Sequence, residues 1–246
     1  MQTVLSDFNT RVQEINKYFS FLENLVNETI KLAVVEDDTT QKIRGIDPEL
    51  VKTLKANGFL LLYNLIESSM TNAIEAIFDE LKENEISFDS VRAEIKKTVL
   101  QNLKNRSPDN IHKDIADISI DIITVGFKRK ELFSGNIDQK EITRTARKYG
   151  FSDRTDYSKT KHGKNLYGIM EIRNNLAHGD KSFSEVGKNT SIEDLLKIKE
   201  EVIEYIGQIL NNISNYLTEQ EYLAIRTNSL KNSLDMFEDT LSDNLT

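Results

Sequence analysis

The chain has 246 residues, of which 38% are hydrophobic, and it contains 2 prolines, 10 glycines and no cysteine. This is enough apolar material for one large domain or two small ones, and the missing cysteines exclude disulfides and thiolate metal sites. The formal net charge of −8 disfavours broad contact with nucleic acid, which depends on neutralising phosphates, and no apolar run approaches the roughly 20 residues that cross a bilayer.

Hydrophobic residues recur at helical spacing along the N-terminal half, and no convincing alternating strand pattern is present. The sequence predicts a first helix over residues 3–34 and a polar connection over residues 36–46. A second long helix is expected from Pro48 to about Lys82, with Asp47 as its N-cap. Further helices are expected over residues 87–103 and 111–127, on either side of the break NRSPDN.

The C-terminal half also reads as a series of helices. A short helix is expected between Asp138, a capping residue, and Gly150, a terminating residue. The next helix ends at His178 before Gly179, and a long helix begins after Ser191. A last helical segment over residues 219–237 precedes a tail over 238–246 that we expect to fray. We therefore predict one all-α, multi-helix domain, in the cytoplasm, with its core at about residues 110–217 and helices 3–104 packed on that core.

One segment of this acidic chain is basic. From Lys128 to Lys164 there are 11 Lys and Arg against 5 Asp and Glu, a net of +6, so the rest of the chain carries −14. Such a segment is compatible with a local phosphate site. It is equally compatible with a solvated face that happens to be rich in lysine.

An arginine stands on the apolar face of the helix that ends at His178. On a helical projection, Arg173 lies about 40° from Ile169, inside the sector that also holds Leu166, Ile172 and Leu176. A buried guanidinium needs compensation, because an unpaired buried charge is very costly. An internal Asp or Glu, a wet cleft, a symmetric partner chain or an anionic ligand could each supply it.

The histidine of the same helix points elsewhere. Arg173 and His178 are five residues apart, about 140° around a regular helix, so one helix does not aim both at a small target. His178 could simply interact with the negative end of the helix. Tyr167, Glu171, Asn174 and His178 form a polar stripe that either faces water or lines a cleft.

The motif RNNLAH, residues 173–178, has the Arg-polar-x3-His form that marks the HEPN superfamily of helical ribonuclease and nucleotide-binding domains. The flanking text ELFSGNIDQKEITRTARKYGFS, IRNNLAHGDKSFSEVG and SIEDL resembles the MAE-like branch of that superfamily. The resemblance covers roughly residues 130–217 and extends more loosely over the N-terminal helices.

The resemblance implies a homodimer in which two motif helices meet and form one composite, metal-free site that cuts RNA. Arg173 would hold the phosphate, His178 would act as base and acid, and Asn174 would orient the histidine or the phosphate. Tyr167, Glu171 and Asn175 would support them. The expected RNA-binding residues are Lys140, Arg144, Arg147, Lys148, Lys161, His162 and Lys164.

The same resemblance implies a toxin or antiviral-defence role, with no cofactor and a possible antitoxin or other defence partner. The lack of a long apolar run predicts no membrane contact. A different function remains open, namely a catalytically inactive HEPN module that binds nucleotide or RNA or assembles with other proteins. The intact Arg173, Asn174 and His178 favour the enzyme, and the net charge of −8 favours the inactive module.

Overall fold

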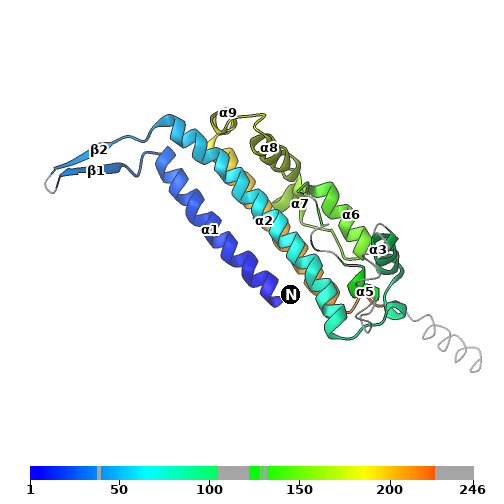
Figure 1. The fold of residues 1–246 in the computed structure, drawn as a ribbon. Helices are drawn as coiled ribbons and strands as arrows, with labels where there is room; N and C mark the ends of the chain where they lie inside the picture. Colours follow the sequence, from blue (N-terminus) through cyan, green and yellow to red (C-terminus); the bar gives the residue numbers. More distant parts are fainter. Residues whose placement is uncertain (38–39, 105–121, 128, 130–131, 134, 225–246) are drawn as a thin grey trace, which may run out of the picture.

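The computed structural model describes residues 1–37, 40–104, 122–127, 129, 132–133 and 135–224. Its long helices are α1 (Gln2–Val26), α2 (Pro48–Glu83) and α10 (Ile192–Thr218), which run side by side (Figure 1). Shorter helices α3 (Ala93–Lys104), α5 (Ile122–Val125), α6 (Gln139–Tyr149), α7 (Tyr157–Thr160), α8 (Leu166–His178) and α9 (Phe183–Lys188) complete the fold. The all-α prediction is confirmed.

The three long helices pack because each presents an apolar stripe. Phe8, Ile15, Phe19, Leu22 and Leu25 of α1 are buried, as the sequence predicts. On α2, Asp47 caps the first turn by accepting a hydrogen bond from the Glu49 amide at 3.0 Å. A Cβ at Gly58 of α2 would lie 3.2 Å from Phe19 of α1 and 3.3 Å from Leu195 of α10. Gly58 thus sits at a point where all three helices are in close contact.

The prediction of a helix over 3–34 and a polar connection over 36–46 is wrong in part. Helix α1 ends at Val26, and β1 (Leu32–Asp37) pairs with β2 (Thr40–Arg44) in an antiparallel hairpin that extends away from the helices (Figure 1). Leu32 is 47% exposed and Ile43 is 72% exposed. Because these residues are not buried in a core, the hairpin does not need the alternation that normally reveals a strand.

Two further boundaries differ from the prediction. The helix expected over 87–103 is split into a 3₁₀ helix, η1 (Phe88–Ser90), and α3, because Val91 forms a β-bridge with Leu223 and the Arg92 amide donates to the Tyr222 carbonyl. The chain after α10 forms turns over residues 219–222 and the bridge at Leu223, where the sequence had predicted a helix. The rest of the last predicted helix, the tail, and most of the helix predicted over 111–127 lie outside the described residues.

The predicted ends of the shorter helices are largely confirmed. Asp138 accepts from the Glu141 amide at 2.8 Å, and Gly150 ends α6 in the left-handed conformation with φ 93°. The Glu141 side chain does not close a capping box but pairs with Arg144. A full capping box, which we did not predict, joins Ser182 and Glu185 at the start of α9.

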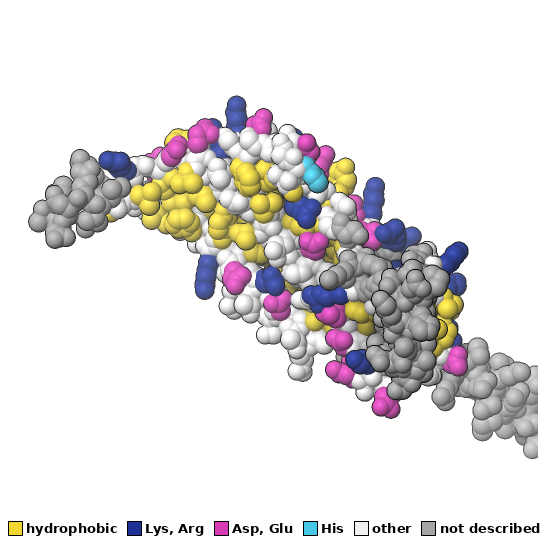
Figure 2. Space-filling model, in the orientation of Figure 1, with side chains coloured by type: hydrophobic (Ala, Val, Ile, Leu, Met, Phe, Trp, Pro, Cys, Tyr) yellow, Lys and Arg dark blue, Asp and Glu magenta, His cyan; other side chains and the backbone are white. Residues whose placement is uncertain are grey.

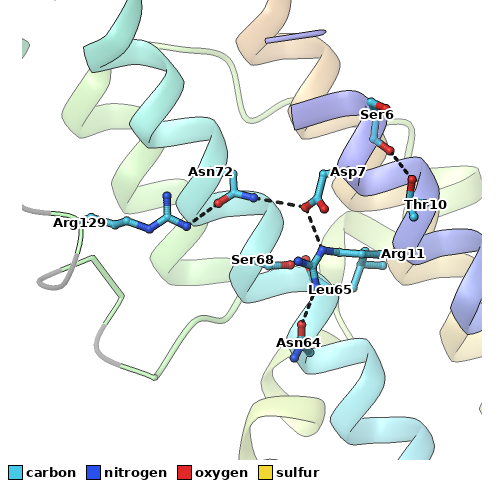
Figure 3. Close-up of polar contacts among 9 residues, drawn as sticks. All are labelled: Ser6, Asp7, Thr10, Arg11, Asn64, Leu65, Ser68, Asn72 and Arg129. Atoms are coloured by element: carbon cyan, nitrogen blue, oxygen red, sulfur yellow. Dashed lines mark hydrogen bonds and ion pairs between the residues drawn. The ribbon is translucent and has the colours of Figure 1, made fainter. Parts of the chain in front are cut away.

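A chain of polar contacts ties α1 to α2 and to the basic segment (Figure 3). Asp7 accepts hydrogen bonds from Arg11 at 2.8 Å and from Asn72 at 3.3 Å, and Asn72 accepts one from Arg129 at 2.7 Å. Arg129 also pairs with Glu75. These contacts hold Arg129 against α2. Arg129 lies close in sequence to the loop that precedes α6.

The surface is uneven in character. Hydrophobic side chains gather toward the hairpin end of the long helices on the face in Figure 2, and charged side chains of both signs lie along the upper edge and over the other half. Among the described helices, none combines the length and the apolar character that crossing a membrane requires.

Candidate active site on helix α8

Helix α8 is held by a narrow buried stripe and by glycines at both ends. Leu166, Ile169 and Leu176 are buried. Before the helix, Gly163 has φ 72°, and a Cβ there would lie 2.9 Å from the ring of Tyr205 on α10. After it, Gly179 has φ 77° and closes the helix by donating to the Asn175 carbonyl. The predicted end of the motif helix is confirmed.

Arg173 is partly buried and has no carboxylate partner among the described residues. Its guanidinium lies over the ring of Tyr63, 4.9 Å from the ring centre. Its Nη1 donates to the Asn174 Oδ1 at 2.9 Å and, at 3.5 Å, to the Gly135 carbonyl. Both acceptors are neutral, and within the described chain neither Nε nor Nη2 has an acceptor. The positive charge is thus partly shielded from water without being neutralised.

Two residues that we did not predict as part of the site contact the Arg173 guanidinium. Tyr63, on α2, supplies the ring, and its hydroxyl accepts a hydrogen bond from the Ile137 amide at 3.4 Å. Burial raises the pKa of Tyr63, so the phenol stays neutral. Gly135 has φ 73°, and a Cβ there would lie 3.4 Å from both Nη1 and Nη2 of Arg173. Nothing in the sequence pointed to Tyr63 as part of a site. Gly135 is a residue type that is common in turns, which is the one signal that could have drawn attention to it.

Asn174 joins the motif helix to the loop that precedes α6. Its Oδ1 accepts from Arg173, and its Nδ2 donates to the Asn136 Oδ1 at 3.0 Å. The sequence led us to expect that Asn174 orients the histidine or a phosphate. In the structure it contacts the arginine and connects residues that are 38 positions apart, and its expected role stays a prediction.

His178 lies in the last turn of α8 and is exposed. Because α8 stays regular up to His178, the imidazole and the Arg173 guanidinium diverge by about 140° around its axis. Tyr167 is 56% exposed and Glu171 is exposed, so most of the predicted polar stripe faces outward. Asn175 acts through its backbone, since its carbonyl also accepts from the Asp180 amide at 2.9 Å.

The predicted RNA-binding residues fall into two groups. Arg144, Arg147 and Lys148 line a cleft of about 720 Å³ between α3 and α6, and Asn136 lines the same cleft. Lys140 is exposed beside it, on the first turn of α6, but does not line it.

The second group lies around the 3₁₀ helix η3 (Lys161–Gly163), just before α8. There the His162 ring tilts against Tyr157, and the Lys161 ammonium lies over the same ring. Lys164 is exposed. This group lies just before the first residue of α8, and His178 is the last residue of α8. The two therefore stand at opposite ends of the motif helix.

The model of the MAE_28990-like HEPN family matches residues 1–222, which is most of the chain and includes every residue of the site. Neither a curated protein nor a solved structure matches the chain.

Proposed function

The chain belongs to the MAE_28990-like HEPN family, and from this membership and the state of Arg173 we propose that it is a metal-independent endoribonuclease acting as a homodimer. HEPN domains are often ribonucleases. The observation that carries the proposal is a partly buried guanidinium whose hydrogen-bond acceptors are neutral and whose other N–H groups are unused within the described chain. An anionic phosphate is the ligand that would complete it.

RNA supplies its own nucleophile, so the protein needs only a base, an acid and a positive charge. The 2′-oxygen forms a bond to phosphorus while the bond from phosphorus to the 5′-oxygen breaks. One histidine takes the proton of the 2′-hydroxyl, and a second gives a proton to the leaving 5′-oxygen. Arg173 holds the phosphate oxygens as charge develops. The products are a 2′,3′-cyclic phosphate and a 5′-hydroxyl.

A homodimer would explain how Arg173 and His178 could act on one phosphate although they point in different directions on α8. A second copy related by a two-fold axis would bring another Arg173 and another His178 to the same place. His178, Tyr167 and Glu171 are exposed on α8 and so are accessible to a facing subunit. The role as a toxin or antiviral effector, with or without an antitoxin, belongs to the same proposal.

A second candidate is a module that binds nucleotide or RNA without cutting it. The observation in its favour is that no hydrogen bond within the described chain orients the His178 ring, whereas catalytic histidines are commonly fixed by a partner. A facing subunit or the substrate would have to supply that partner in the enzyme.

The test is digestion of a defined RNA by the full chain, with analysis of the fragment ends. We expect 2′,3′-cyclic phosphate and 5′-hydroxyl ends, full activity in the presence of a chelator, and no cutting of DNA of the same sequence. His178→Ala and Arg173→Ala should each abolish cutting with helical circular dichroism unchanged. Arg154→Ala, at an exposed arginine outside the site, is the matched control.

Two results would contradict the proposal. One is activity that survives both changes at α8 or that requires magnesium. The other is a protein that light scattering finds only as a monomer at concentrations where it cuts RNA. Expression of the native chain in bacteria should also be toxic and that of His178→Ala harmless; equal tolerance of both would favour the non-cutting module.

A further inference from the structure

The cleft between α3 and α6 is large, open and bordered by cations from two helices. Its volume of about 720 Å³ lies within the range typical of ligand sites. Lys97 of α3 faces it from one side, and Arg144, Arg147 and Lys148 of α6 face it from the other. Lys97 lies outside the basic segment 128–164, so only the fold reveals that it belongs to this group.

Two acids, Glu94 and Glu141, also line the cleft, but most of its cations form no direct ion pair among the described residues. Glu141 pairs with Arg144 at 2.7 Å, and Glu94 pairs with Arg92 at 3.0 Å, so both acids already have a cation partner. Lys97, Arg147 and Lys148 form no ion pair within the described part of the chain. Partial removal of water, followed by repulsion from Arg144, lowers the pKa of Lys148, although the residue remains exposed. The cleft therefore concentrates positive charge that a bound anion would relieve.

The aromatic residues of the cleft do not offer ring faces for base stacking. Phe133 is 9% exposed and Tyr149 is 1% exposed. Proteins that bind single strands without sequence preference combine a basic groove that tracks the backbone with aromatic faces on which bases stack, and this cleft supplies only the basic groove. This cleft fits contact with phosphates rather than with bases.

The cleft is joined to the candidate site by one residue. Asn136 lines it and accepts the hydrogen bond of Asn174, which itself holds Arg173. We propose that this cleft binds the sugar–phosphate backbone of single-stranded RNA and leads it to the phosphate held by Arg173. The inference rests on the proposed function for the direction of the strand, but the binding can be measured without any cutting.

The experiment uses full-length protein carrying His178→Ala, so that RNA stays intact, and a fluorescent single-stranded RNA followed by anisotropy over a range of salt concentrations. Lys97→Gln with Arg147→Gln removes two cations from the cleft. Arg154→Gln with Lys159→Gln removes two exposed cations that do not line it. The two double variants have the same net charge, and circular dichroism checks their folding.

Removing one cation that neutralises a phosphate of a single strand reduces the salt slope of log K by about 0.7, so the slope of the cleft variant should be smaller by about 1.4. If the binding curves converge near 1 M salt, this corresponds to an affinity about 25-fold weaker at 0.1 M salt. The control variant should keep the slope of the parent. Changing the RNA sequence at constant length should have little effect on the affinity or on the salt slope.

Equal slopes for the cleft variant and the parent, equal weakening in the cleft and control variants, or undetectable binding would each overturn the inference. Equal affinity for a duplex of the same sequence would overturn the assignment to a single strand. Cleft-dependent binding by a wild-type chain that cuts no RNA would refute the proposed nuclease and leave the cleft assignment standing. If the cleft variant cuts RNA as well as the native chain and keeps its salt slope, the cleft assignment is refuted and the proposed nuclease stands.

Discussion

Replacing Gly187 by alanine should loosen helix α9 from α2. A Cβ at this position would overlap the carbonyl oxygen of Lys52 and lie 2.5 Å from its carbonyl carbon, both of which are backbone atoms of α2. A flexible side chain could move aside, but the hydrogen-bonded backbone near the start of α2 is much less free to move, so α9 must shift. Inserting one methyl group into a packed site commonly costs about 1–3 kcal/mol, and contact with backbone favours the upper end.

The matched control is Gly168→Ala, in the interior of α8, where an added Cβ would meet nothing within 4 Å. Alanine in a helix is favoured over glycine by about 0.5–1 kcal/mol, so this variant should gain stability. For a chain of this size, about 1 kcal/mol corresponds to about 2–4 °C in Tm. Thermal melts followed by circular dichroism should therefore place Gly187→Ala below, and Gly168→Ala above, the native protein. A Gly187→Ala variant that melts with the native chain would refute the close contact of α9 with α2.

Two other predictions concern the site and its support. Tyr63→Leu should lower kcat/KM of RNA cutting by about 2- to 30-fold, because it removes a ring–cation contact worth about 0.5–2 kcal/mol, whereas Tyr63→Phe should stay near native activity; equal activity of the two variants would show that the ring does not place Arg173. The pKa of Glu49 is lowered by hydrogen bonds from Lys52 and Ser184, so its ionised form stabilises the fold at neutral pH, and this contribution is lost as pH falls through that lowered value. The Tm of Glu49→Gln should accordingly be below that of the native chain at about pH 7 and should approach it at about pH 3; a gap independent of pH would contradict this.

Periodicity and capping chemistry predicted most of the helices because they are local properties. The stripe of α1, the cap at Asp47 and the ends of α6 and α8 all depend on residues within a turn or two of each other. The hairpin was missed because the strand residues whose burial is described, Leu32, Ala33, Ile43 and Arg44, are exposed and impose no alternation. The interruption between η1 and α3 was missed because it depends on a bridge from Val91 to Leu223, which is distant in the sequence.

The site, too, was predictable from the sequence only in its local features. Arg173 on an apolar face raised the question of its compensation, and the sequence left several answers open. No helical wheel of α8 could reveal that Tyr63 and Gly135 would surround the guanidinium, since both arrive from other parts of the chain. Likewise Asn174 could be placed on the polar stripe, but its contact with Asn136 depends on where the loop before α6 passes.

The contact between Gly135 and Arg173 also bears on how this site could be lost. At position 135 the backbone adopts a conformation that side chains rarely tolerate, and its carbonyl is one of the two hydrogen-bond acceptors of the arginine among the described residues. A descendant of this chain could keep all six letters of RNNLAH and still misplace the guanidinium through one change at position 135. Scoring the motif alone would count such a descendant as competent, so the integrity of the site has to be judged on two distant stretches together.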